Sequence, residues 1–78
     1  MVYIYIKTYW WDDMGESSPI ELKVYSDPSR AIENLPEHSW EEQLERLKDE
    51  GIIEFFSPTL FPVAHDEDRI RIFRREFA

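Results

Sequence analysis

Residues 2–11 read VYIYIKTYWW, and this stretch decides the fold of the chain. The residues alternate between two sets, so one face of an extended chain carries Val2, Ile4, Ile6, Thr8 and Trp10. Period-two order in β-branched and aromatic residues predicts a β-strand. Because both faces are largely apolar, the strand is expected in the interior of a sheet rather than at its edge.

A second strand is expected at residues 20–25, where Ile20, Leu22 and Val24 alternate with other side chains. The connection at residues 12–19 is polar and contains one Gly and one Pro, which is typical of a loop. The two strands are therefore predicted to form an antiparallel hairpin with a long loop.

Two helices are predicted after the hairpin. The first begins at Asp27, which can accept hydrogen bonds from the first turn, and Pro36 ends it. The second begins at Ser39, because Ser39 and Glu42 have the spacing of a capping box. Its apolar stripe consists of Trp40, Leu44 and Leu47, and Gly51 is placed to close it.

The remaining residues predict more strands. Residues 52–56 and 69–75 have strand patterns. Pro62 confines residues 60–64 to an edge strand or an irregular path. The order ββααβ(β)β indicates an α+β fold with a mainly antiparallel sheet of four to five strands and two helices on one face. A chain of 78 residues has room for one core, so a single domain is expected over residues 1–78.

Charge is distributed unevenly along the chain. Residues 1–68 contain 5 Lys/Arg and 16 Asp/Glu, a net of −11, whereas residues 69–78 contain four Arg and one Glu, a net of +3. The surplus of carboxylates repels nucleic acid backbones and anionic lipid, so neither is an expected direct partner. With no cysteine, no apolar stretch long enough to cross a bilayer and no signal-peptide pattern, a cytoplasmic protein is expected.

Carboxylates of the second predicted helix form a column. Glu41, Glu45 and Asp49 follow each other at four-residue spacing, about 6 Å apart along the axis. The column is either a solvated face or a surface that imitates a nucleic acid backbone. DNA carries one charge per ~3.4 Å on each strand, so mimicry would need further acids. The candidates in the predicted loops are Asp12, Asp13, Glu16, Asp66, Glu67 and Asp68.

The tyrosine face of the first strand is a second candidate surface. It carries Tyr3, Tyr5, Tyr9 and Trp11, and Phe73 and Phe77 could extend it. Two interpretations are open: another segment covers this face, or it binds protein, since Tyr and Trp are favoured interface anchors. Tyr5, Tyr9 and Trp11 are therefore candidate contact residues, either for a partner or for a homodimer.

The arginine-rich last strand and the histidines are weaker candidates. Arg69, Arg71, Arg74 and Arg75 are expected to pair with carboxylates such as Glu21, Glu54 or Glu76, the alternative being a phosphate-binding strip. His65 lies beside Asp66 and Asp68, but no metal-ligand spacing accompanies it. No nucleophile motif surrounds Ser17, Ser18 or Ser57. We expect no enzymatic activity, no metal and no cofactor.

In size, acidity, absence of cysteine and sheet-plus-helix design, the chain resembles the small inhibitors that phages encode against host defences, including anti-CRISPR proteins and DNA mimics. The resemblance covers the whole chain and includes no specific motif. It implies binding to a protein with a basic surface, such as the nucleic-acid groove of a host defence enzyme. The leading hypothesis is an acidic, non-enzymatic inhibitor, and the alternative is an interaction module that self-associates through its aromatic strand face.

Overall fold

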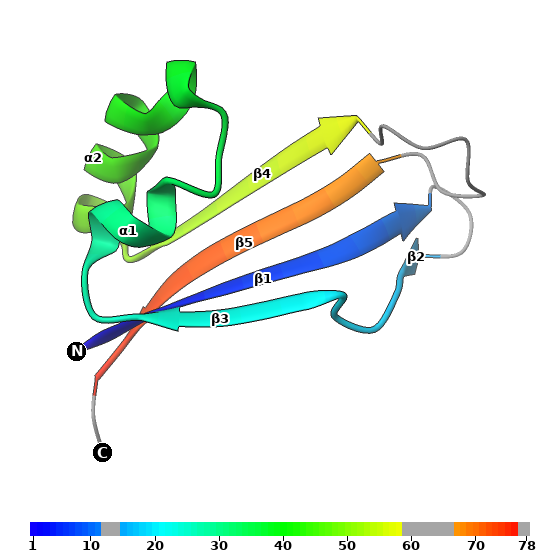
Figure 1. Ribbon diagram of the computed structural model, residues 1–78, viewed down its shortest axis with the longest axis horizontal. Coiled ribbons are helices and arrows are strands. Elements are labelled where there is room, and N and C mark those ends of the chain that lie inside the picture. The colour runs from blue at the N-terminus through cyan, green and yellow to red at the C-terminus, as the bar shows by residue number, and fades with distance from the viewer. Residues whose placement is uncertain (12–14, 59–66, 77–78) are drawn as a thin grey trace.

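The computed structural model describes residues 1–11, 15–58 and 67–76 (Figure 1). Its elements, in chain order, are β1 (Val2–Trp11), β2 (Gly15–Glu16), β3 (Glu21–Tyr25), α1 (Pro28–Ile32), a 3-10 turn η1 (Glu37–Ser39), α2 (Trp40–Glu50), β4 (Ile52–Pro58) and β5 (Glu67–Arg75). The expected α+β class is confirmed. The predicted strand at residues 60–64 lies outside the described residues.

All strand pairs of the sheet are antiparallel, and β1 lies in its interior as expected. One side of β1 pairs with β5, which in turn pairs with β4, and the other side pairs with β3 and the two-residue β2. The predicted hairpin is therefore present. The longest pairing joins the first and last strands of the chain, from Val2 opposite Arg75 to Trp10 opposite Glu67.

Both helices lie on one face of the sheet, where they cover the end at which β1 begins (Figure 1). The core between the layers consists of Tyr5, Ala31, Ile32, Leu35, Leu47, Ile53, Ile70 and Ile72. Strand register explains this set, because Tyr5 lies opposite Ile72, and Ile72 lies opposite Ile53. The odd-numbered side chains of β1 therefore face the helices, and the even-numbered ones face the other side.

The start of α1 agrees with its sequence signal. The Asp27 carboxylate accepts hydrogen bonds from the backbone N–H of Ser29 at 3.0 Å and from its hydroxyl at 2.7 Å. The helix ends at Ile32, before the expected Pro36. A hydrogen bond of 2.7 Å from the indole Nε1 of Trp40 to the carbonyl of Leu35 then joins the connection to α2.

The predicted capping box at Ser39 was wrong. The 3-10 turn η1 leads directly into α2, so Ser39 already has helical backbone angles, φ −102° and ψ −5°. Its hydroxyl donates to the carbonyl of Pro36 at 2.8 Å instead of capping α2. The other end of α2 is as expected: Gly51 has φ 77°, and its N–H donates to the carbonyl of Leu47 at 2.9 Å.

Among the described residues, no helix has both the length and the apolar character that spanning a membrane requires.

Candidate functional site

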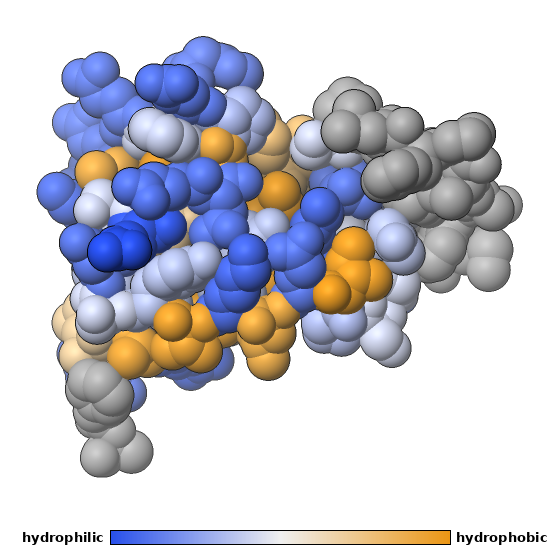
Figure 2. All heavy atoms as spheres, in the orientation of Figure 1, coloured by the Kyte–Doolittle hydropathy of each residue, from blue (hydrophilic) through white to orange (hydrophobic). Residues whose placement is uncertain are grey.

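Charge in this protein separates by layer. The strands together contain six Lys/Arg and five Asp/Glu, a net of +1. Residues 27–50, which form the helical layer, contain three Lys/Arg and eight Asp/Glu, a net of −5. All eight acids of the helical layer are exposed. In Figure 2, hydrophilic side chains accordingly gather over α1 and α2, and hydrophobic ones lie along β3 at the lower edge.

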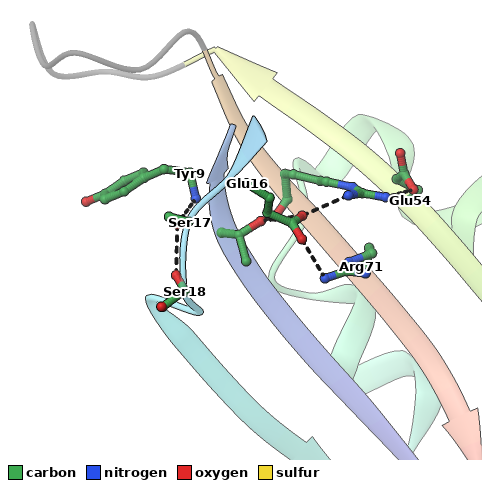
Figure 3. A network of polar contacts seen from close by, with 8 residues as sticks. Tyr9, Glu16, Ser17, Ser18, Glu54 and Arg71 are labelled. Carbon is green, nitrogen blue, oxygen red and sulfur yellow. Dashed lines mark hydrogen bonds and ion pairs between the residues drawn. The ribbon is translucent and has the colours of Figure 1, made fainter. Parts of the chain in front are cut away.

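Four of the five acids on the strands contact neighbouring bases. Glu16 contacts Arg69 at 2.8 Å and Arg71 at 3.2 Å, and Glu54 contacts the other side of Arg69 at 2.8 Å (Figure 3). Lys7 bridges Glu21 and Asp68 at 3.7 and 3.5 Å. The expected pairing of the last-strand arginines with carboxylates is thus observed for two of them, with Glu16 as a partner that the sequence did not indicate.

Glu16 is held in its ionised form. Partial burial of the Glu16 carboxyl raises its pKa, but the hydrogen bond from Thr8 and the guanidinium groups of Arg71 and Arg69 outweigh burial, so the net pKa is lowered. The Thr8 hydroxyl, which is buried, donates to Glu16 at 2.9 Å. This carboxylate is therefore part of the framework of the sheet.

The other two arginines of β5 have different contacts. Arg74 donates to the carbonyl of Lys48 at 3.2 Å, where a cation is favourable at the C-terminal end of α2. Arg75 lies over the ring of Phe73 at 5.3 Å. Within the described residues, neither arginine forms an ion pair with a carboxylate.

The helical column expected from the sequence is present. Glu41, Glu45 and Asp49 are all exposed on α2, and no base within the described residues pairs with them. Arg46 contacts Glu50 at 3.4 Å on another side of the helix. The column therefore carries three uncompensated charges.

The loop acids do not join this column as far as they are described. Glu16 lies opposite Trp10, so it occupies the face of the sheet away from the helices. Glu67 also lies opposite Trp10, whereas Asp68 lies on the helical side and is paired with Lys7. The predicted contact residues Asp12, Asp13 and Asp66 lie outside the described residues.

A groove between α1 and α2 adjoins the acidic column. It has a volume of about 350 Å³, and its almost entirely apolar lining comes from Ile32, Trp40 and Leu44. Exposed carboxylates of Glu33 and Glu41 flank it, one on each helix. The sequence gives the Trp40–Leu44 stripe, but the contribution of Ile32 depends on how the helices pack, so the groove itself was not predicted.

The tyrosine face is largely a core face, which corrects one candidate residue. Tyr5 is 3% exposed beneath the helices, and its burial raises the pKa of its hydroxyl to about 12. It cannot anchor a partner on the surface. Tyr9 is half-buried at the far end of the strand, and the Trp11 side chain lies outside what the structure describes. Phe73 lies opposite Ile4 and so belongs to the other face, contrary to expectation.

Metal-site candidates remain few. His38 is exposed in η1, and His65 lies outside the described residues. In the part of the chain that the structure describes, no group of three or more His, Asp and Glu side chains is arranged to hold a metal ion.

No protein-family model, no curated protein and no solved structure matches this chain. Function is therefore inferred from its surfaces alone.

Proposed function

We propose that the protein is a non-catalytic, acidic inhibitor whose helical layer binds a basic surface on a protein partner. The observation that carries this proposal is the separation of charge: the strands have a net of +1, and residues 27–50 have a net of −5. The partner class that fits this chemistry is a host defence protein with a basic nucleic-acid-binding surface. The inhibitor would then be phage-encoded and would meet this partner in the host cytoplasm.

Free carboxylates differ in function from paired ones. A paired acid such as Glu16 has already found its cation, and a partner gains little by approaching it. The carboxylates of Glu41, Glu45 and Asp49 produce a field that extends into solvent. Such a field accelerates encounter with a surface of opposite charge, by an amount that falls as salt rises.

The groove between the helices supplies a complementary contribution. An arginine or lysine has an apolar stem and a charged head, so its stem would fit over Trp40 and Leu44 while its head reaches Glu33 or Glu41. An aromatic ring with a cation packed on it is also a favourable contact in itself. Charge would thus set the rate of encounter, and burial of apolar surface in the groove would slow dissociation.

Backbone mimicry is only partly supported by these dimensions. The column presents a charge every ~6 Å, which is sparser than one strand of DNA at one charge per ~3.4 Å. Glu33 and Glu37 lie in the same helical layer and are also exposed, so they increase the density of charge. The layer is therefore a more suitable match for a patch of separated Lys or Arg side chains than for a site that reads phosphate spacing.

A pair of matched variants tests the proposal. Glu41→Gln with Glu45→Gln removes two charges from the column. Glu67→Gln with Glu76→Gln removes one charge from β5 and one from the residue that follows it, both outside the helical layer. Each double variant changes the net charge from −8 to −6. Each variant is used to capture proteins from a bacterial lysate, with duplex DNA as competitor. We expect the first pair to weaken capture about tenfold and the control pair to have little effect.

The proposal requires that captured proteins be displaced by DNA and by salt. Equal capture by the two variants, or capture that neither DNA nor salt reduces, would show that the helical layer is not the binding surface.

A further inference from the structure

A row of apolar residues crosses the face of the sheet that lies away from the helices. Strand register places Val24 opposite Ile4, Ile4 opposite Phe73, and Phe73 opposite Ile52. We call these four residues the apolar row; it crosses β3, β1, β5 and β4 in order. Leu22 and Ile6 lie beside the row on the same face, since they are two residues away along their strands.

This face is exposed in the part of the chain that the structure describes. Val24 is 61% exposed, Leu22 63% and Ile52 54%, and the core between sheet and helices includes none of them. An antiparallel sheet with one solvated face normally carries polar residues on that face. An aliphatic row across four strands is larger than the scattered apolar residues of ordinary surfaces, so it requires a cover.

Charge indicates what the cover is. The charged residues described on this face are three acids, Glu16, Glu54 and Glu67, and three arginines, Arg69, Arg71 and Arg75, a net of zero. The whole chain has a net charge of −8, so two copies repel each other over most of their surface. This face has no net charge and carries the apolar row, so it is the one through which a second copy can approach, whereas a basic partner is drawn to the helical layer instead.

The area of this face also supports a second copy of the chain as its cover. Four strands about 4.8 Å apart span roughly 19 Å, and a strand of nine residues spans about 30 Å. The whole face, its charged end included, therefore covers roughly 500–600 Å² on each copy, or about 1,100 Å² in total. This is close to the lower limit for a specific interface, which indicates a dimer that forms on the order of micromolar concentrations.

A cluster of charged and aromatic side chains orders one end of this face. Arg69 lies over the rings of Trp10 and Phe56, at 5.3 and 5.9 Å, and its guanidinium is held by Glu16 and Glu54 (Figure 3). These side chains are fixed by each other before any partner arrives, so little side-chain entropy is lost on association.

We propose that two copies of this chain pack sheet against sheet through the apolar row, with a two-fold axis between them. The helices then lie on the outside of a sandwich whose sheets are about 10 Å apart. Such a dimer presents two acidic helical layers on opposite sides. The proposal stands on the sheet alone and does not depend on the function proposed for the helices.

The test compares association of two variants that add the same charge. Val24→Glu places a carboxylate in the apolar row, which the second copy would cover, and Ser26→Glu places one just beyond β3 on an exposed residue. Both side chains are well exposed in the monomer, so both variants are expected to fold. Circular dichroism and thermal melting check this.

Sedimentation equilibrium over a range of concentrations gives the outcome. The wild type is expected to move from 9.5 kDa toward twice that mass, and Val24→Glu to need at least tenfold higher concentration to do so, while Ser26→Glu changes little. Added salt should strengthen the dimer, since it screens the repulsion between two chains of −8.

Three results would overturn the proposal: a wild type that stays at 9.5 kDa at millimolar concentration, equal association of the two variants, or a dimer that salt dissociates. Glu41→Gln with Glu45→Gln should leave self-association intact. The sedimentation experiment therefore tests the dimer independently of the proposal that the helical layer binds a basic partner.

Discussion

Arg69 on β5 contacts four side chains that come from three other strands, and its removal provides a sharp test of the structure. Its guanidinium contacts Glu16 on β2 and Glu54 on β4, each at 2.8 Å, and lies over Trp10 on β1 and Phe56 on β4. The hydrogen bond to Glu54 is the main reason why the pKa of Arg69 is raised. Arg69→Met removes the charge and keeps most of the apolar stem.

The magnitude follows from these contacts. The Arg69 side chain is 21% exposed, and Glu16 and Glu54 are 24% and 42% exposed, so each ion pair is intermediate between a surface pair and a buried one. We assign about 1 kcal/mol to each pair and about 0.5 kcal/mol to the stacking on Trp10. The expected loss of unfolding free energy is about 2–3 kcal/mol.

Arg75→Met is the matched control for this prediction. Arg75 is also on β5 and also lies over an aromatic ring, that of Phe73 at 5.3 Å, but no carboxylate among the described residues pairs with it. Its replacement should therefore cost about 0.5 kcal/mol or less. The comparison isolates the two ion pairs from the general effect of losing a cation in an acidic protein.

Urea unfolding followed by tryptophan fluorescence measures both variants. A domain of this size has an unfolding free energy of roughly 4–12 kcal/mol, so Arg69→Met should remain folded in the absence of urea. With an m-value of about 1 kcal/mol/M, its midpoint should fall by roughly 2 M. If the midpoints of the two variants agree within about 0.5 M, the arginine does not hold these strands together.

Two further predictions concern the same framework. Gly51→Ala should destabilise the protein by about 1–2 kcal/mol, as measured by a urea titration. Gly51 has φ 77°, and an added Cβ would lie 3.0 Å from Nη2 of Arg74. Unchanged stability would contradict the described end of α2. Lowering the pH should reduce stability as Glu16 is protonated, because the pKa of Glu16 in the folded protein lies below its ordinary value of 4.5. The contribution of Glu16 to stability is complete above 4.5 and is lost as the pH falls through the folded pKa. Urea midpoints measured between about pH 3 and 7 should fall less steeply in Arg69→Met than in the wild type, and parallel curves would remove Glu16 as the cause.

Local signals in the sequence predicted the elements well because their causes are local. Alternation in residues 2–11 gave the strand, Asp27 marked the start of α1, and Gly51 marked the end of α2. The capping box failed for a reason that is nearly local: the turn η1 already places Ser39 in a helical conformation, and its hydroxyl bonds to Pro36.

The faces of β1 could not be assigned from the sequence, because both are apolar. Which face is buried depends on where the helices pack, and they pack on Tyr5 rather than on Ile4 and Ile6. The sequence therefore favours a binding patch on the tyrosine face, whereas the exposed aliphatic side chains lie on the opposite face. The pairing of Glu16 with Arg69 could not be predicted for a similar reason, because nothing near Glu16 in the sequence indicates that Arg69 will lie beside it.

The two proposed surfaces respond to salt in opposite directions, and this follows from the layering of charge. The helical layer has a surplus of carboxylates, so its attraction to a basic partner weakens as salt rises. The uncovered sheet face carries the apolar row and has no net charge, so the main effect of salt on the dimer is to reduce repulsion between two acidic chains. A dimer joined through the sheet leaves both helical layers free, and a partner with two basic patches would then bind more tightly to the dimer than to Val24→Glu. Equal binding by the wild type and Val24→Glu, at concentrations where the wild type is dimeric, would show that the dimer adds nothing to recognition.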